Sequence, residues 1–141
     1  MKKSLIRLDG ALIQWNEALL LDHEGNISEG AVANIFLVID NTLITPPTDS
    51  ILPGITRTSV LLIAQQLNIA TKKTVTIHDI SLATEAFFAG TASEITSIKS
   101  IEQHSFSPTA LVVTDKIKNA YHAITSGGNI HFKSWLTFIQ Q

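Results

Sequence analysis

The sequence contains no cysteine among its 141 residues. This absence excludes disulfides, thiolate metal sites and thiol nucleophiles together. Because disulfides are typical of secreted domains, it also favours a cytoplasmic location. The chain also has no surplus of basic residues. It contains 10 Lys and Arg residues and 12 Asp and Glu residues, which gives a formal net charge of −2. We therefore expect no nucleic-acid partner, because the chain has no excess of positive charge to hold a phosphate backbone.

Long hydrophobic runs are also missing. Apolar runs such as residues 18–21 and 60–64 are far shorter than the roughly 20 residues that cross a bilayer. The first six residues begin like a signal peptide, but Arg7, Asp9 and Gly10 interrupt the apolar stretch. We therefore expect neither a membrane partner nor a secretory signal.

Charged residues are scarce, at 16% of the chain against about a quarter in a typical domain, whereas apolar residues reach 45%. Soluble monomers avoid large exposed apolar patches, so we expect something outside this chain to cover part of the surface. The alternative is a well-buried monomer whose surface is rich in serine and threonine.

The length and the sequence pattern predict a single domain of mixed α and β structure over residues 1–141. Apolar residues at helical spacing, or after a helix-starting Pro-Gly pair, predict helices over residues 5–14, about 55–67 and 113–124, with a short helical turn ending near residue 84. Apolar and β-branched runs predict strands over residues 18–21, 34–39, 42–45, 71–77, 86–89 and 95–101. The two-residue turn Asp40-Asn41 can join only antiparallel strands, which argues against a purely parallel sheet. The apolar tail, residues 135–139, is expected to dock on the core.

Three short loops combine small residues, hydroxyls and exposed backbone amides. Residues 27–30 place Glu29 beside a glycine between two strands, where a carboxylate can face a crevice. Residues 52–57 place Gly54 before a helix whose first residues include Thr56, so free amides and a hydroxyl can form a phosphate cup. Residues 90–95 form a small-residue turn at a strand end, with the Thr91 hydroxyl free for an anion. Taken one at a time, each loop is also typical of a solvated turn or of ordinary helix capping.

Other motifs carry little chemistry. The five histidines show no spacing that would pair them as metal ligands, so no metal site is predicted. No G-x-S-x-G, P-loop or G-x-G-x-x-G motif occurs.

The order and spacing of the loops resemble the class IV pyridoxal-phosphate aminotransferases, over most of residues 11–125. The segments that carry this resemblance are residues 17–22, 27–30, 34–36, 45–47, 52–57, 88–96 and 113–121. Within the class, the chain is most similar to branched-chain amino-acid aminotransferases, with D-amino-acid aminotransferase and aminodeoxychorismate lyase as near alternatives. The resemblance implies an α+β fold, in which a mixed and folded sheet (a pseudo-barrel) has flanking helices, as in the C-terminal large domain of these enzymes. It also implies a homo-oligomer that acts on an amino or keto acid.

The resemblance gives each loop a role toward pyridoxal phosphate. Glu29 would pair with the pyridine nitrogen and keep it protonated, so that the ring can accept electrons from the substrate. Ile55 and Thr56 would bind the phosphate at a helix N-terminus, and the Thr91 hydroxyl would add a further contact. Leu52 would lie against the face of the ring.

The substrate contact implied by the resemblance is a pair of backbone amides. The amides of Thr91 and Ala92 would lie near the substrate carboxylate. Val32 stands where the family usually has a small residue, so its branched side chain could crowd the ring.

The lysine that carries the cofactor in this family lies further upstream of Glu29 than the chain extends. Lys2 and Lys3 are too close to Glu29 to replace it, and the small N-terminal domain of the family is missing as well. We therefore predict no catalytic residue in this chain. Transamination of branched-chain or related amino acids is expected to be impaired or absent, and pyridoxal phosphate to bind weakly and without a covalent link. The alternative is a non-enzymatic domain that acts in self-association or partner binding.

Overall fold

The computed structural model describes residues 3–8, 17–128 and 130–135. Nine strands and three α-helices follow one another along these residues, with short 3-10 helices at Thr48–Ser50 and Ile130–Trp135. The strands are β1 (Lys3–Leu8), β2 (Glu17–Leu21), β3 (Ile27–Gly30), β4 (Asn34–Ile39), β5 (Thr42–Ile44), β6 (Thr71–Lys72), β7 (Glu85–Gly90), β8 (Glu94–Ile101) and β9 (His104–Ser105). The α-helices are α1 (Ile55–Gln66), α2 (Ile77–Leu82) and α3 (Val112–Thr125).

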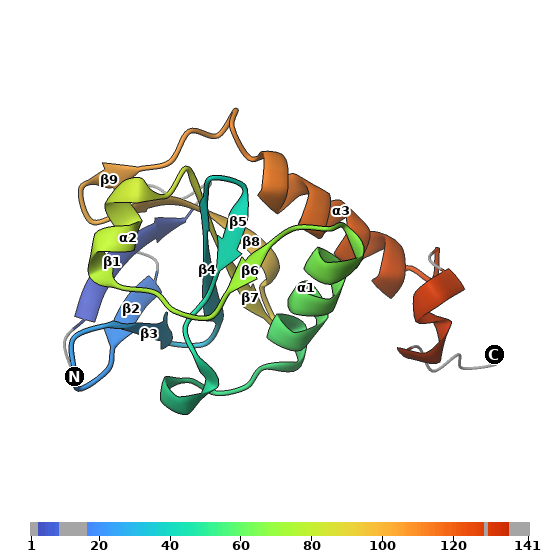
Figure 1. Ribbon diagram of the computed structural model, residues 1–141, viewed down its shortest axis with the longest axis horizontal. Coiled ribbons are helices and arrows are strands. Elements are labelled where there is room, and N and C mark those ends of the chain that lie inside the picture. The colour runs from blue at the N-terminus through green and yellow to red at the C-terminus, as the bar shows by residue number, and fades with distance from the viewer. Residues whose placement is uncertain (1–2, 9–16, 129, 136–141) are drawn as a thin grey trace.

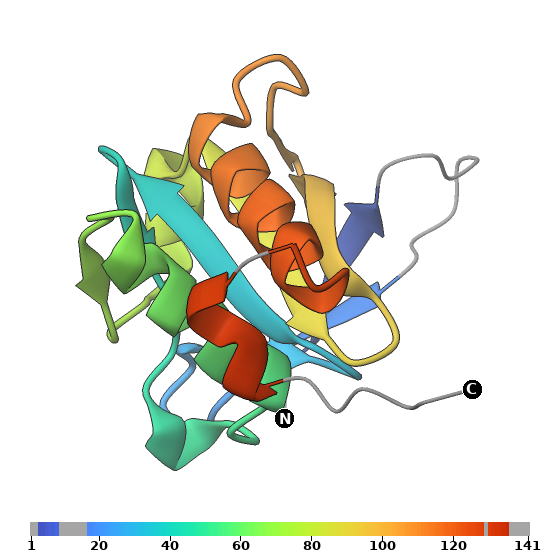
Figure 2. The same cartoon turned by 90° about the vertical axis from the view of Figure 1, so that its right-hand side faces the viewer.

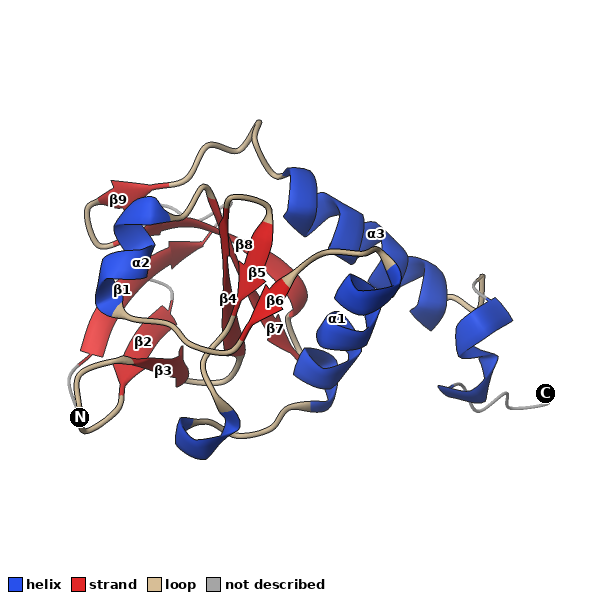
Figure 3. Cartoon of the chain, in the orientation of Figure 1, coloured by secondary structure: helices blue, strands red, loops and turns tan. Residues whose placement is uncertain are grey.

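The described strands form one sheet in the order β3-β2-β1-β8-β7-β4-β5-β6, with β9 paired to β8. Every pair is antiparallel except β5 with β6, which is parallel. The predicted α+β fold with a mixed, folded sheet and flanking helices is therefore confirmed (Figure 3).

Both faces of the central strands are buried, because β4 and β7 send alternate side chains into two different cores. Ile35 and Leu37 of β4 enter a core that residues of β2 and β3 and of the end of α2 also line. Phe36 and Val38 enter a second core under α1 and α3. These two helices lie side by side across β4 and β7, and α2 lies on the other side of the sheet (Figures 1 and 2).

The turn between β4 and β5 has the predicted form. Asp40 and Asn41 adopt positive φ angles of 48° and 58°, as a two-residue type I′ hairpin requires. The register of Ile39 with Thr42 places the turn between directly paired residues. This local prediction is confirmed.

Two predicted elements are wrong. Residues 5–8, the start of the helix expected over residues 5–14, instead belong to strand β1 between β2 and β8, since pairing with two neighbours outweighs a short helical pattern. The rest of that predicted helix, residues 9–14, lies outside the described residues. The strand expected over 71–77 is only two residues long, because the Asp79 carboxylate accepts the backbone N–H and hydroxyl of Thr76 and starts helix α2 there.

The apolar C-terminal segment is only partly described. Phe132 is 5% exposed and belongs to the core under α1 and α3, and its ring meets that of Trp135 edge to face. Of the tail expected to dock, residues 135–139, the structure describes Trp135, which contacts the Phe132 ring but is 43% exposed, and residues 136–139 lie outside the described residues.

Candidate functional site

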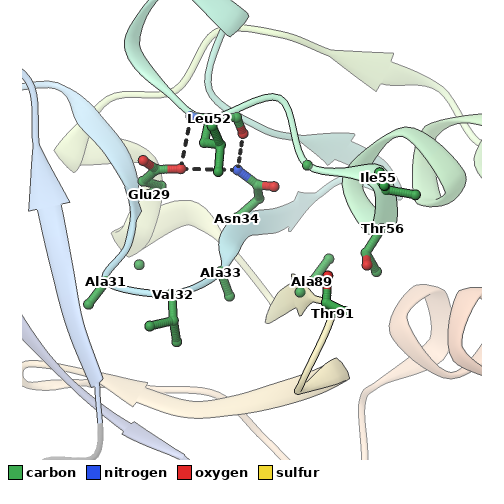
Figure 4. Close-up of a pocket in the computed structure, with 13 residues that line it drawn as sticks. Glu29, Ala31, Val32, Ala33, Asn34, Leu52, Ile55, Thr56, Ala89 and Thr91 are labelled. Carbon is green, nitrogen blue, oxygen red and sulfur yellow. Dashed lines mark hydrogen bonds between the residues drawn. The ribbon is translucent and has the colours of Figure 1, made fainter.

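A cavity of about 160 Å³ lies where three loops meet at one end of the sheet. The loops are the β3–β4 connection, the segment before α1 together with its first residues, and the end of β7 (Figure 4). The lining residues are Glu29, Gly30, Ala31, Val32, Ala33, Asn34, Leu52, Gly54, Ile55, Thr56, Ala89, Gly90 and Thr91. Segments far apart in the sequence are thus brought to one place.

The β3–β4 connection turns within residues 31–33 and presents a carboxylate to the cavity. The amide of Gly30 donates to the carbonyl of Ala33 at 2.7 Å, which closes the turn. A Cβ atom on Gly30 would lie 2.7 Å from Cε1 of Phe88, so only glycine fits against that ring. The turn therefore packs directly on the core while Glu29 remains partly exposed.

The Glu29 carboxylate is held by a small hydrogen-bond network. Its Oε2 accepts the Asn34 side-chain amide at 3.2 Å and the backbone amide of Leu52 at 3.1 Å. The same Asn34 amide group donates to the carbonyl of Leu52 at 2.9 Å. The network therefore joins the carboxylate to the segment that leads into α1.

The first turn of α1 provides donors for an anion. The first intrahelical hydrogen bond runs from the amide of Thr58 to the carbonyl of Gly54 at 3.0 Å, so the amides of Ile55 and Thr56 have no intrahelical acceptor. Among the described residues, the hydroxyls of Thr56 and Thr91 have no hydrogen-bond partner either. A phosphate group can be bound by these two amides and two hydroxyls together with the positive end of the helix.

A buried guanidinium fixes the position of this helix end. Arg57 is 3% exposed, and its Nη2 donates to the carbonyl of Pro46 at 2.8 Å, with a longer contact of 3.4 Å from Nε to Oγ1 of Thr45. Burial lowers the pKa of Arg57 from its ordinary value, because the charged form loses hydration. The side chain ties α1 to the end of β5, outside the cavity lining.

The structure brings most of the predicted site residues together. Glu29, Leu52, Ile55, Thr56 and Thr91 all line the cavity, whereas Ala92 does not. Thr56 is buried, and the side chains of Leu52 and Ile55 are 73% and 84% exposed.

Val32 also lines the cavity, and it is 78% exposed. Asn34 is missing from the predicted set, although a polar residue at the start of an otherwise apolar run, residues 34–39, is a usable signal.

Within residues 3–8, 17–128 and 130–135, no three His, Asp or Glu side chains gather as a metal site. No helix in these ranges has the length and apolar character needed to span a bilayer.

Comparison with known proteins identifies the relatives of this chain. The family described as "Amino-transferase class IV" matches residues 11–101. The branched-chain-amino-acid aminotransferases of Pseudomonas aeruginosa and Escherichia coli K12 are 34% and 37% identical over 127 and 130 residues. These alignments cover 89% and 90% of this chain but only 41% and 42% of the relatives, so the chain spans about two fifths of their length.

Solved structures agree with this relationship. The branched-chain aminotransferase of Thermoproteus uzoniensis, solved with norvaline, superposes with a TM-score of 0.83 at 40% identity over 87% of this chain and 41% of that one. The branched-chain amino acid aminotransferase of Thermobaculum terrenum, solved in its PLP-form, gives 0.82 at 35% identity over 87% of this chain and 41% of that one. The chain therefore belongs to the class IV aminotransferase family.

Proposed function

We propose that residues 1–141 correspond to the cofactor-binding domain of a branched-chain-type aminotransferase, and that the cavity binds pyridoxal phosphate. The observation that carries this proposal is the pairing of a partly exposed carboxylate with a cluster of free amide and hydroxyl donors in one cavity. The relative from Thermobaculum terrenum was solved in a PLP-form, which supports the choice of ligand. When bound, pyridoxal phosphate supplies an electron-accepting ring for amino-group transfer.

Each end of the cavity has a separate task. Glu29 would accept a hydrogen bond from the ring nitrogen and so favour its protonated form. The amides of Ile55 and Thr56 and the hydroxyls of Thr56 and Thr91 hold the phosphate. Leu52 would lie against one face of the ring and limit its contact with water. The amides of Thr91 and Ala92 serve the substrate carboxylate.

Turnover by these residues alone is expected to be impaired or absent. Among the described residues, no lysine lines the cavity, so the part of the site seen here offers no amine to attach the cofactor. Binding then depends on hydrogen bonds and ring contacts, and we expect an affinity of about millimolar to micromolar. The substrate we propose is a branched-chain or related amino acid, after the relatives' names.

Self-association belongs to the same proposal. Val32, Leu52 and Ile55 are large apolar side chains that stand mostly exposed at the cavity. A second copy of the chain, or another partner, would remove this surface from water. These exposed side chains also support the alternative of a non-enzymatic domain that acts in association.

Thermal unfolding with inorganic phosphate tests the anion site. At tens of millimolar phosphate we expect a stabilisation of about 1 kcal/mol, which is a shift in Tm of a few degrees. Thr56→Ala should remove most of this shift, because it deletes a phosphate donor. Thr58→Ala is the matched control, since Thr58 does not line the cavity and its hydroxyl already donates to the carbonyl of Gly54.

A cofactor titration completes the test. Glu29→Gln should leave the phosphate shift intact and alter the absorption spectrum of bound pyridoxal phosphate. If phosphate does not shift the Tm of the unmodified chain, the anion site is rejected, and the non-enzymatic alternative becomes the better account.

A further inference from the structure

Asn34 is a polar side chain at the start of β4 that is nevertheless 5% exposed. Its Nδ2 donates to Oε2 of Glu29 and to the carbonyl of Leu52. Both partners are acceptors, so the NH₂ group must face them and Oδ1 must point away. A buried amide that uses both N–H groups is held in a single orientation.

The two oxygens of the Glu29 carboxylate are used differently. Oε2 accepts two hydrogen bonds, from Asn34 and from the amide of Leu52 (Figure 4). Among the described residues, Oε1 accepts none. One oxygen therefore anchors the carboxylate, and the other is left to accept an N–H from a bound molecule.

Asn34 also touches the segment that enters α1. A Cβ atom added to Gly54 would overlap Oδ1 of Asn34. Gly54 has φ −71° and ψ 144°, which suit any residue, so glycine is needed there for space rather than for conformation. Asn34 thus fits against residues 52–54 through one hydrogen bond and one close contact.

We propose that Asn34 is a positioning residue that fixes Glu29 and links this carboxylate to the N-terminus of α1. The link keeps a set distance between the group that meets the ring nitrogen and the groups that meet the phosphate. A buried partner that orients a functional side chain is the usual way in which such precision is achieved. The ligand assigned to the two ends rests on the proposed function, whereas the link itself is a property of the ligand-free chain.

The first experiment therefore uses no ligand. NMR hydrogen exchange of the Leu52 amide reports on its bond to Glu29. In Asn34→Ala this amide should exchange about tenfold faster, because the carboxylate loses its second donor and the 52–54 segment its anchor. Asn26→Ala is the matched control, since it removes an Asn-to-Glu hydrogen bond of 3.3 Å from an exposed turn. It should leave Leu52 unchanged.

A second variant displaces the Asn34 side chain without changing Asn34 itself. Gly54→Ala should speed Leu52 exchange as well, by pushing Oδ1 away. The double variant Asn34→Ala/Gly54→Ala should match Asn34→Ala alone, because the added methyl then meets only Cβ of Arg57, at an ordinary van der Waals distance of 3.8 Å. Gly54→Ala by itself keeps the test valid where Asn34→Ala does not fold, because it leaves Asn34 in place. Unchanged Leu52 exchange in Gly54→Ala, or in a folded Asn34→Ala, overturns the proposal.

The next experiment adds pyridoxal phosphate and records its absorption spectrum. Asn34→Ala should change the spectrum in the direction of Glu29→Gln and weaken binding about tenfold, while Asn26→Ala should match the unmodified chain. If Asn34→Ala binds the cofactor with an unaltered spectrum and affinity, Asn34 does not position Glu29 and the proposal is wrong. If the unmodified chain binds no pyridoxal phosphate, the proposed function fails, and Leu52 exchange alone decides whether Asn34 positions Glu29.

Discussion

The N-terminus of helix α3 is capped from a distant strand. Glu85 opens β7 and is 2% exposed. Its Oε1 accepts the amide of Val113 at 3.0 Å and its Oε2 the amide of Thr114 at 2.7 Å. The residue before α3, Leu111, provides no side-chain cap. Two otherwise unpaired amides at the positive end of a helix are thus satisfied by one buried carboxylate.

The cost of disrupting this cap can be worked out from its bonds. Each hydrogen bond to a charged group contributes about 1.5–3 kcal/mol. Glu85→Gln keeps the shape of the side chain, but turns one acceptor into an NH₂ group that faces a backbone N–H. One bond is lost, the other weakens and the charge at the helix end disappears, so we expect a loss of about 2–4 kcal/mol. For a domain whose total stability is about 5–15 kcal/mol, this is a large share.

Urea unfolding, followed by circular dichroism and by tryptophan fluorescence, measures this loss. Glu102→Gln makes the same chemical change at an exposed turn, where no hydrogen bond of the carboxylate is seen among the described residues, and should cost less than about 0.5 kcal/mol. A cost below about 1 kcal/mol for Glu85→Gln would refute the reasoning, because it would mean that the two short bonds contribute almost nothing.

Two further predictions concern backbone positions, and urea unfolding tests both. Gly30→Ala should cost about 1–3 kcal/mol, because its Cβ would overlap the Phe88 ring in the packed core; an unchanged midpoint would show that the ring can move aside freely. Asn41→Val should cost about 1–2 kcal/mol, since a β-branched residue is strained at φ 58°. Asn41→Gly should be neutral or slightly stabilising, and equal stabilities for the valine and glycine variants would contradict the assigned turn.

Features that depend on neighbouring residues could be predicted from the sequence. The Asp40-Asn41 hairpin is one, because its positive φ angles are tolerated by these side-chain types. Helix α1 is another, since Pro53 and Gly54 mark its start and the apolar spacing marks its buried face. The grouping of Glu29 with the start of α1 follows from the order of the loops and not from any single one.

Features that depend on distant partners could not be predicted from the sequence. Residues 5–8 show helical spacing but become part of strand β1 because β2 and β8 lie on either side of them. Glu85 caps amides 28 and 29 positions further along the chain, and no local pattern signals such a bond. The role of Asn34 is hidden for the same reason, since its donors meet Glu29 and Leu52 only after folding.

The place of β1 inside the sheet has a consequence for refolding. Ile6 of this strand pairs with Ile101, 95 positions along the chain, while Lys3 pairs with Leu20. A contact between residues so far apart in the sequence forms slowly, because a long loop must close first. Until β1 docks, β2 and β8 present open backbone edges that the β1 segment of another molecule can occupy equally well. Refolding at high protein concentration should therefore produce strand-swapped dimers, and refolding at high dilution should suppress them.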